Sequence, residues 1–370
     1  MDNKKILIVC KSFYPDNSPR SFRATELAKE LIKQGHLVTV LMAGNDFDYS
    51  EFISKHNLTI TNYGRLVLKP LEKSKWKWIG DNKRKFGRLL YMLFNYPDIE
   101  IMFRLKKALK KQSGYDLMIS IAVPYPVHWG TAWARTKRHL IANTWVADCG
   151  DPFMGNKLES FRFPFYFAWL EKWFCRKADF ISVPVEGAKH GYYKEFHSKI
   201  KIIPQGINFD EVEISHEKTA HPFPIFAYAG GLSFSGIRNP LFFMKYLIEC
   251  NTDFEFHIYS SSSKAFLSST IQESKGKIIL HEAIPRTDLI LELSKMDFLV
   301  NLDNGTSLQV PSKLIDYALT LKPILNVNQI LNIKVIEEFL AGDYKNAYEV
   351  KNIDQYRIEN ICQQFLYLDK

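Results

Sequence analysis

The sequence of residues 5–42 is KILIVCKSFYPDNSPRSFRATELAKELIKQGHLVTVLM. Its apolar run at 6–10 predicts a buried strand, and a second run at 37–42 predicts another. Between them, apolar residues recur over 24–31 at the three- and four-residue spacing of an amphipathic helix. Ser21 is the expected N-cap, because a serine side chain accepts hydrogen bonds from unpaired helical N–H groups. The stretch therefore predicts a strand, a helix and a parallel strand.

The same alternation continues along the chain. Further strands are predicted at 116–121, 144–148, 180–183, 200–203, 225–228, 254–259, 277–280, 298–301 and 323–327. Helices are predicted after Pro124, Asn239 and Pro285, from Pro311, and at 159–177 and 353–368. Strands that alternate with helices favour parallel, doubly wound sheets. Two such sets in a chain of 370 residues predict an α/β protein with two Rossmann-like domains.

The expected domain boundaries follow from this alternation. We expect an N-terminal Rossmann-like domain at 1–207, a linker at 208–224, a second Rossmann-like domain at 225–352 and a C-terminal helix at 353–370. The linker stretch is polar and shows neither helical nor strand periodicity. The last helix is expected to pack back on the first domain. Because parallel sheets bind ligands at the carboxyl ends of their strands, the site is expected in a cleft between the domains.

Cysteine usage and apolar runs predict the compartment. The five cysteines are far apart and none belongs to a C-x-x-C pair, which favours a reducing environment. The first residues show no apolar stretch typical of a signal peptide, and no apolar run approaches the length that spans a bilayer. We therefore expect a cytoplasmic protein whose contact with the plasma membrane is peripheral.

Residues 69–111 carry the whole net charge of the chain. Thirteen Lys and Arg residues stand there against four Asp and Glu, and this excess of nine equals that of 49 basic over 40 acidic residues in the full sequence. Tryptophans alternate with the cations, a pattern typical of anionic membrane surfaces. The candidate membrane patch comprises Lys75, Trp76, Lys77, Trp78, Lys83, Arg84, Lys85 and Arg88. A solvated amphipathic face is an alternative; nucleic acid is another, but no recognition motif accompanies the charge.

The predicted helix start at Pro311 is the strongest candidate for an anion site. Backbone N–H groups are unpaired where Pro311 and Ser312 open the helix, and Lys313 adds a full positive charge. Asp316 follows within one turn and can accept hydrogen bonds from ribose hydroxyls. An ordinary capped helix with solvated charges is the alternative.

A second candidate follows the predicted strand at 225–228. Gly230 and Gly231 allow a ligand to approach the backbone closely. Arg238, next to Asn239, can hold a diphosphate through its planar guanidinium. A tight turn with a surface arginine is the alternative.

Polar residues also follow strands of the first domain. Asp148 and Asp151 come at the end of the strand at 144–148, where two carboxylates favour an acid–base role. His128 is expected at the same edge of the sheet. Helix capping by the aspartates, and a structural role for the histidine, are the alternatives.

Several motifs, taken in order, resemble those of the bacterial family-four glycosyltransferases. They are Ile6-Leu7-Ile8-Val9 with Phe13-Tyr14-Pro15, the helix at 24–31 followed by Gly35-His36, Pro204-Gln205-Gly206, and Pro311-Ser312-Lys313 with Asp316-Tyr317. The likeness covers essentially the whole chain. It implies the GT-B fold, retention of the anomeric configuration, and a nucleotide sugar bound mainly by the C-terminal domain. It also implies a place in capsule, O-antigen or exopolysaccharide assembly.

The resemblance further implies roles for single residues. Asp316 stands where the second acidic residue of the family holds the ribose. Arg238 lies close to the position of a family cation that meets the diphosphate. Three residues, Asn17, Ser18 and Arg20, belong to a loop that matches the one closing over the donor.

Two positions depart from the family pattern, and one motif is known from a different glycosyltransferase fold. Leu308 stands where the family has its first acidic residue, and Gly231 stands where it has an arginine. Asp46 and Asp48 form a D-x-D pair, which binds a metal in another glycosyltransferase fold. GT-B enzymes use cations and helix dipoles at the leaving diphosphate instead, so we expect no metal and no other cofactor.

The sequence therefore predicts a retaining glycosyltransferase that uses a nucleotide sugar. The expected acceptor is a lipid-linked saccharide at the inner, anionic face of the plasma membrane, in bacterial surface polysaccharide biosynthesis. A nucleotide-sugar epimerase of the same architecture is one alternative. A non-catalytic binding protein is another, and the residues Leu308 and Gly231 favour it.

Overall fold

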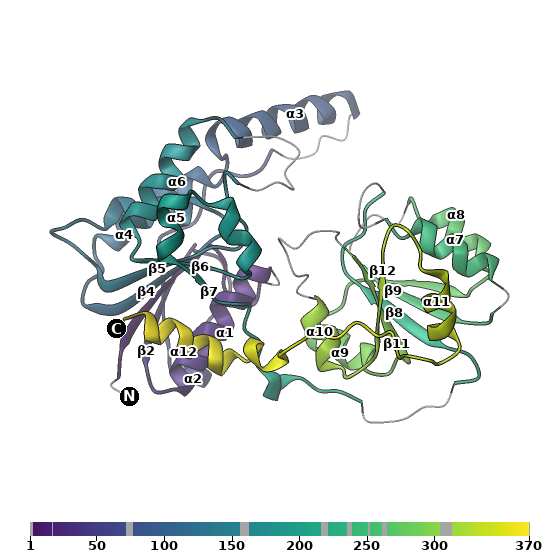
Figure 1. Ribbon diagram of the computed structural model, residues 1–370. Coiled ribbons are helices and arrows are strands. Elements are labelled where there is room, and N and C mark those ends of the chain that lie inside the picture. The colour runs from purple at the N-terminus through teal and green to yellow at the C-terminus, as the bar shows by residue number, and fades with distance from the viewer. Residues whose placement is uncertain are drawn as a thin grey trace. The chain divides into compact units, whose positions relative to one another are not determined.

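The computed structural model describes residues 3–16, 18–71, 77–155, 163–215, 221–234, 239–250, 252–260, 265–303 and 313–369, with the backbone alone at 77–84 and 369. The chain forms two compact units (Figure 1). Unit 1 comprises Met1–Ile207 and Tyr356–Lys370, and unit 2 comprises Asn208–Gln355.

Unit 1 is built on a parallel sheet with the strand order β3-β2-β1-β4-β5-β6-β7. Its strands are β1 (Lys5–Val9), β2 (Leu37–Met42), β3 (Thr59–Asn62), β4 (Tyr115–Ile121), β5 (Ala142–Asp148), β6 (Phe180–Val183) and β7 (Ile200–Ile202). Its α-helices are α1 (Pro19–Lys33), α2 (Ser50–His56), α3 (Lys77–Phe94), α4 (Ile99–Leu109), α5 (Pro126–Ala134), α6 (Tyr166–Lys177) and α12 (Ile358–Leu366). Short 3-10 helices occupy Glu186–Gly191, Lys194–Lys199 and Tyr367–Asp369.

Helices cover both faces of this sheet. The residues Ile6–Val9 of β1 are all fully buried, as expected for an inner strand of a parallel sheet. Ile6 and Ile8 share a core with residues of α1 and α12, whereas Leu7 and Val9 share one with residues of α4, α5 and α6. Because successive side chains of a strand point to opposite faces of the sheet, this one apolar run contributes to two cores.

The C-terminal helix packs back on unit 1, as predicted (Figure 1). Its apolar residues Ile358, Ile361, Cys362 and Phe365 recur at helical spacing and are buried against α1. The chain enters the helix beside Gly206, where an added Cβ would lie 2.5 Å from the Cδ1 atom of Ile358. The absence of a side chain at Gly206 therefore allows α12 to pack closely against the backbone there.

Unit 2 repeats the design with a parallel sheet of order β10-β9-β8-β11-β12. Its strands are β8 (Ile225–Ala229), β9 (Glu255–Tyr259), β10 (Ile278–His281), β11 (Phe298–Leu302) and β12 (Ile324–Val327). Its α-helices are α7 (Leu241–Glu249), α8 (Ser268–Glu273), α9 (Arg286–Leu293), α10 (Lys313–Leu319) and α11 (Ile333–Leu340), with 3-10 helices at Phe209–Glu211 and Ile353–Tyr356. Two parallel Rossmann-like sheets confirm the predicted fold class.

The first helix begins earlier than predicted. Ser18, and not Ser21, is the N-cap, and its Oγ atom accepts a hydrogen bond from the Ser21 N–H at 3.3 Å. Pro19 takes the first helical position, where its fixed φ suits the helix and its missing N–H has no consequence. Arg20 therefore lies in the first turn of α1 and not in a loop. The helix predicted at 159–177 is helical from Tyr166 in its described part.

Candidate functional site

The end of β8 in unit 2 forms a close backbone turn. Gly230 has a φ of 140°, a value that L-residues rarely adopt. Its N–H donates a hydrogen bond to the Tyr259 carbonyl at 3.0 Å, and the Tyr228 hydroxyl donates one to the Gly231 carbonyl at 2.9 Å. The backbone at this glycine pair is therefore held in one shape at the carboxyl end of the sheet, where α/β proteins bind ligands.

Tyr317 holds α10 against this turn. Its buried hydroxyl accepts a hydrogen bond from the Ala229 N–H at 2.7 Å and lies 3.3 Å from the Ala229 carbonyl. Lys313, one turn earlier, places its Nζ atom 4.1 Å from the centre of the Tyr228 ring. A Cβ added at Gly230 would lie 3.7 Å from the Cδ atom of Lys313. The fold thus brings the predicted residues Gly230 and Lys313 together.

Asp316 lies on the same helix and pairs with a residue that the motifs did not suggest. Arg286, at the start of α9, donates hydrogen bonds to Asp316 Oδ1 from Nε at 3.0 Å and from a terminal nitrogen. Burial raises the pKa of the Asp316 carboxyl, and the charge of Arg286 opposes that rise. The Asp316 side chain keeps 16% of its surface exposed, so a ligand hydroxyl can still reach it.

Of the four other residues predicted to bind the donor, the structure describes two. Asn239 lies two residues before α7; its Oδ1 atom accepts a hydrogen bond from the Leu241 N–H at 3.0 Å, and its amide donates one to the Phe234 carbonyl at 2.7 Å. Gly231 belongs to the β8 turn described above. Arg238 and Ser312 lie outside the described residues.

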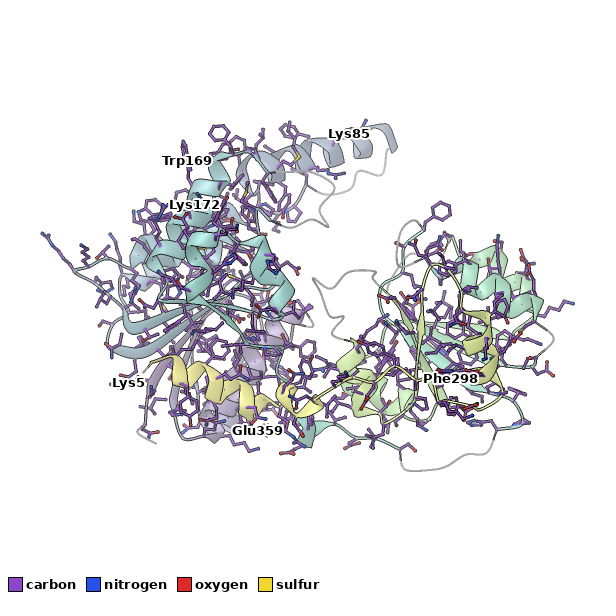
Figure 2. The ribbon with its side chains drawn as sticks, viewed as in Figure 1. Lys5, Lys85, Trp169, Lys172, Phe298 and Glu359 are labelled. Atoms are coloured by element: carbon purple, nitrogen blue, oxygen red, sulfur yellow. The ribbon has the colours of Figure 1, made fainter. Side chains whose placement is uncertain are left out.

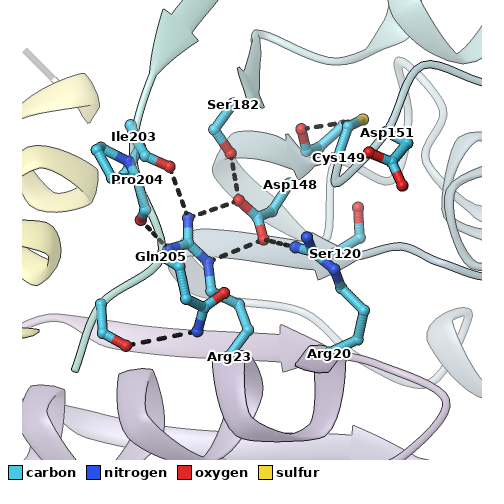
Figure 3. A network of polar contacts seen from close by, with 12 residues as sticks. Arg20, Arg23, Ser120, Asp148, Cys149, Asp151, Ser182, Ile203, Pro204 and Gln205 are labelled. Atoms are coloured by element: carbon cyan, nitrogen blue, oxygen red, sulfur yellow. Dashed lines mark hydrogen bonds and ion pairs between the residues drawn. The ribbon is translucent and has the colours of Figure 1, made fainter. Parts of the chain in front are cut away.

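In unit 1, Asp148 is the centre of a buried ionic network (Figure 3). Arg23 donates to both carboxylate oxygens, from Nε at 3.1 Å and from a terminal nitrogen at 2.8 Å. Ser182 donates to Oδ1 at 2.7 Å, and a terminal nitrogen of Arg20 lies 3.6 Å from Oδ2. Burial alone would raise the pKa of Asp148, but the charges of Arg23 and Arg20 and these hydrogen bonds outweigh it and hold that pKa below its usual value.

The same network fixes the first turn of α1. Arg23 also donates to the carbonyls of Pro204 and of Ile203, the latter at 3.2 Å, and so joins α1 to the segment after β7. The Arg20 guanidinium lies against Gly150, where an added Cβ would come within 2.5 Å of it. Asn17, beside the cap Ser18, lies outside the described residues. Arg23 was not predicted, because its partners lie more than a hundred residues away along the chain.

His128 is fully buried on α5 and both of its ring nitrogens have partners. Nδ1 lies 2.8 Å from the Ser120 hydroxyl, which accepts a hydrogen bond from the Trp145 indole N–H. The Ser120 proton is therefore free to point at Nδ1, which leaves the histidine proton on Nε2, 3.4 Å from the Cys149 sulfur. Burial lowers the pKa of His128 to about 3, so the ring is neutral.

Asp151 lines a pocket of about 480 Å³, including its open mouth, beyond the carboxyl ends of β4 and β5. Aromatic and polar side chains share its wall: Tyr91, Tyr125, Phe153, Phe163, Asn95, Asp98 and Asp151. The Asn95 Oδ1 atom is buried and has no hydrogen-bond partner among the described residues. Asp98 accepts a hydrogen bond from Lys11 at 2.7 Å. Of these residues only Asp151 was predicted from the sequence, because the pocket forms where stretches at 91–98, 123–125, 151–153 and 163 meet.

The predicted membrane patch falls partly on α3. Lys85 and Arg88 are exposed on this helix. Four further members, Lys77, Trp78, Lys83 and Arg84, belong to its first turns, but their side chains are not described, and Lys75 and Trp76 lie outside the described residues. No described helix has the length and apolar content that crossing a bilayer requires.

The chain is similar in sequence to one protein family and in structure to several solved proteins. A family model described as Glycosyltransferase Family 4 matches residues 22–211. No curated protein matches the sequence. Among solved structures, a glycosyltransferase from Rickettsia africae matches 100% of this chain and 98% of its own at 13% identity, with a TM-score of 0.64.

Two further solved structures are similar over their whole length. HepE from Anabaena, in complex with UDP and glucose, has a TM-score of 0.61 at 10% identity, with 99% of each chain covered. The lipopolysaccharide outer core galactosyltransferase WaaB has a TM-score of 0.59 at 11% identity, with 98% of this chain and 99% of its own covered. At such identities the similarity shows the fold alone, and it confirms the predicted GT-B type.

Proposed function

We propose, from the fact that this chain belongs to glycosyltransferase family 4, that it transfers a hexose from a nucleoside-diphosphate sugar to a saccharide carried on a membrane lipid. Membership makes it a retaining enzyme that uses a nucleotide sugar. The acceptor, the pathway and the site residues are our proposal. The arrangement that carries it is the pair of Tyr317–Ala229 contacts, which hold Lys313 over Gly230 at the end of β8.

The donor binds to unit 2 in this proposal. Its diphosphate lies over the turn at Gly230 and Gly231, with Lys313 and Arg238 as counter-charges and Ser312 at the helix start. Asp316, oriented by Arg286, accepts hydrogen bonds from the ribose hydroxyls. UDP is the natural first choice of nucleotide, since HepE was solved with UDP and glucose.

The transfer itself needs orientation and charge stabilisation. The acceptor hydroxyl attacks the anomeric carbon on the face from which the diphosphate leaves, so the configuration is retained. The bond from carbon to diphosphate oxygen breaks as the new glycosidic bond forms, and the acceptor proton passes to the leaving diphosphate. Preorganised cations such as Lys313 stabilise the charge that develops there, each by about 3 kcal/mol.

Asp148 and His128 act as positioning residues in this scheme. The Asp148 carboxylate is engaged by Arg23 and Ser182, and it holds Arg20 at the start of α1. His128 is neutral and lies behind Cys149, away from solvent. We also propose a role in donor binding for Asn17, Ser18 and Arg20, as the family resemblance implies.

The acceptor saccharide binds in the pocket beside Asp151. Aromatic rings such as Tyr91 pack on the C–H face of a sugar, and its hydroxyls can donate to Asp151 and to the unpartnered Oδ1 atom of Asn95. Tyr91 also belongs to the last turn of α3, the helix that carries Lys85. A lipid-linked acceptor at an anionic inner membrane surface would fit this arrangement. The pathway in our proposal is surface polysaccharide assembly, and the similar structure WaaB is named a lipopolysaccharide outer core galactosyltransferase.

Nucleoside diphosphate release tests the donor site. UDP release from UDP-hexoses is measured with and without octyl glycosides as acceptors, and mass spectrometry detects the extended glycoside. We expect release to depend on an acceptor and Lys313→Ala to lower kcat about a hundredfold. Lys295→Ala, on the exposed side of unit 2, is the matched control and should match the wild type. An epimerised nucleotide sugar without any acceptor product would contradict the proposal.

The kinetics of an Arg286 variant test the ribose contact. Arg286→Gln removes the positive charge that orients Asp316, so we expect the KM for the donor to rise about tenfold with a smaller change in kcat. A variant whose KM equals that of the wild type would place the ribose elsewhere.

A further inference from the structure

Helix α3 exposes its apolar side chains. Among its described side chains, from Lys85 to Phe94, none is buried. Phe86 is 55% exposed, Leu89 44% and Phe94 57%. An amphipathic helix normally buries its apolar face, and packing on that face supplies most of its stability. Residues 90–93 are half-buried and Tyr91 packs against the core of unit 1, but Phe86, Leu89 and Phe94 lie on a face of α3 that this core does not cover.

Helix α6 exposes a second apolar pair on a different segment of the chain. Phe165, just before the helix, is 72% exposed and Trp169 is 68% exposed. Their rings lie one helical turn apart, with centroids separated by 5.7 Å. The opposite face of α6 carries Phe167 and Phe174, which are buried in the core. The exposed pair is therefore additional to the packing that holds α6 in place.

The two helices form one surface. The Tyr166 hydroxyl at the start of α6 donates a hydrogen bond to the Leu93 carbonyl near the end of α3. The rings of Tyr91 and Phe163 pack edge to face, with centroids 5.5 Å apart. In Figure 2 the side chains of Trp169 on α6 and Lys85 on α3 lie along the same border of unit 1. The exposed apolar residues of both helices can thus meet one partner.

Cations lie on the same two helices as these apolar side chains. Lys85 and Arg88 are exposed on α3. On α6, Lys172 and Arg176 follow Trp169 at helical spacing, 3.3 Å and 3.6 Å from Glu195. Apolar aromatic residues beside cations match the two layers of an anionic bilayer, its acyl chains and its head groups. A large exposed apolar surface of this kind marks an interaction site.

We propose that Phe165 and Trp169 insert into an anionic lipid bilayer and form, with Phe86 and Leu89 of α3, a membrane wedge. This inference rests on the proposed function, in which the acceptor is carried on a membrane lipid. It adds a second attachment point from α6 to the basic helix α3. Two attachment points on different helices restrict the tilt of unit 1 on the membrane more strongly than one amphipathic helix does.

Vesicle sedimentation and fluorescence test the wedge with the full-length protein. The probe is a phosphatidylcholine vesicle containing phosphatidylglycerol, with bromine on its acyl chains for the fluorescence measurement. The double variant Phe165→Ala/Trp169→Ala is expected to partition about tenfold more weakly, which corresponds to about 1.4 kcal/mol. The matched control Ile330→Ala removes a side chain that is 89% exposed in unit 2 and should partition like the wild type.

Emission from Trp169 gives an independent measure of insertion. The difference between wild type and Trp169→Phe isolates its fluorescence, which brominated acyl chains should quench. If the double variant binds like the wild type and Trp169 is not quenched, the wedge is overturned while attachment through α3 stands. If the wild type does not sediment at all, membrane attachment fails as well, and UDP release with octyl glycosides still tests the transferase. A concentration-dependent dimer that the double variant abolishes, without lipid binding, would assign the surface to a second copy of the chain.

Discussion

Arg23 and Asp148 form the most buried ion pair described in unit 1, since each side chain keeps 2% of its surface exposed. Arg23 lies on α1 and Asp148 ends β5, so the pair connects a helix to the sheet beneath it. Its two hydrogen bonds, and those to Ser182 and the carbonyl of Ile203, satisfy the charges inside the protein. The guanidinium also lies 5.2 Å from the centre of the Phe365 ring on α12.

Removing one partner of this pair should destabilise unit 1. Arg23→Met leaves the Asp148 carboxylate buried without its main counter-charge, and we expect a loss of about 3–5 kcal/mol in urea unfolding at neutral pH. Arg20→Met is the matched control, because Arg20 is 24% exposed and contacts the same carboxylate at 3.6 Å; a loss of about 1 kcal/mol or less is expected. Equal losses in both variants would contradict this ranking.

The pH dependence of this pair has a definite sign. The folded-state pKa of Asp148 lies below its unfolded value of about 3.9. Its contribution to stability is therefore complete above that unfolded value and is lost as the pH falls through the folded pKa.

Glu171 should make unit 1 less stable as the pH rises. Burial raises the pKa of Glu171 to about 7, although hydrogen bonds from the backbone N–H groups of Met154 and Phe153 lower that pKa in part. Its stabilising effect is complete below the unfolded pKa of about 4.3 and falls between there and about pH 7, by on the order of 3 kcal/mol. Urea titrations across this range should show that decline in the wild type and not in Glu171→Gln.

The control for Glu171 is a carboxyl on the surface. Glu186→Gln removes a side chain that is 68% exposed and paired with Lys189 at 3.6 Å, so it should keep the pH dependence of the wild type. A Glu171→Gln variant that still loses stability over this pH range would assign the dependence to another group.

At the scale of elements, α12 completes the core of unit 1. Its residues Ile361 and Phe365 are fully buried against α1, although more than three hundred residues separate the two helices. The hydrogen bonds between Ile207 and the residues Tyr356 and Ile358 fix its entry. Without this helix, the outer side of α1 would face solvent with apolar residues such as Leu27.

A cavity at Phe365 should destabilise unit 1 alone. Phe365→Ala removes a fully buried ring, and we expect a loss of about 3–5 kcal/mol. Calorimetry should show a lower transition temperature for unit 1 and an unchanged transition for unit 2. Tyr367→Ala, at a ring that is 52% exposed near the same chain end, should leave both transitions in place.

At the scale of the whole molecule, the two units have separate cores and separate tasks in our proposal. Each parallel sheet has its own set of buried apolar residues. The proposed donor residues Gly230, Lys313 and Asp316 all belong to unit 2, whereas the acceptor pocket and the membrane wedge belong to unit 1. A donor nucleotide should therefore stabilise unit 2 and leave the stability of unit 1 unchanged.

UDP should stabilise unit 2 selectively. At a hundred times its dissociation constant, a ligand bound only by the folded state stabilises it by about 2.7 kcal/mol. We expect the calorimetric transition of unit 2 to rise and hydrogen exchange to slow at β8 and α10. Lys313→Ala should reduce both effects. Protection confined to unit 1 would contradict the assignment of the donor site.

Much of the fold follows from local sequence patterns. The strands β1 and β2 appear where continuous apolar runs predicted them, because inner strands of parallel sheets are buried on both faces. The short strand β3 and the helix α2 were missed, since each is brief and only Phe52 of α2 is buried. Their place is decided by packing at the sheet edge, which periodicity does not report.

The sequence by itself determined the α/β class, the two parallel sheets and the presence of a C-terminal helix, because hydrophobic spacing is a local property of the chain. It also marked Gly230, Lys313 and Asp316 through short motifs at strand ends. Only the tertiary structure decided which charges meet. Arg286 orients Asp316, and Arg23 neutralises Asp148. The structure also decided that Tyr166 at the start of α6 bonds to Leu93 of α3. Such pairings depend on distances between segments far apart in sequence, and no local pattern encodes them.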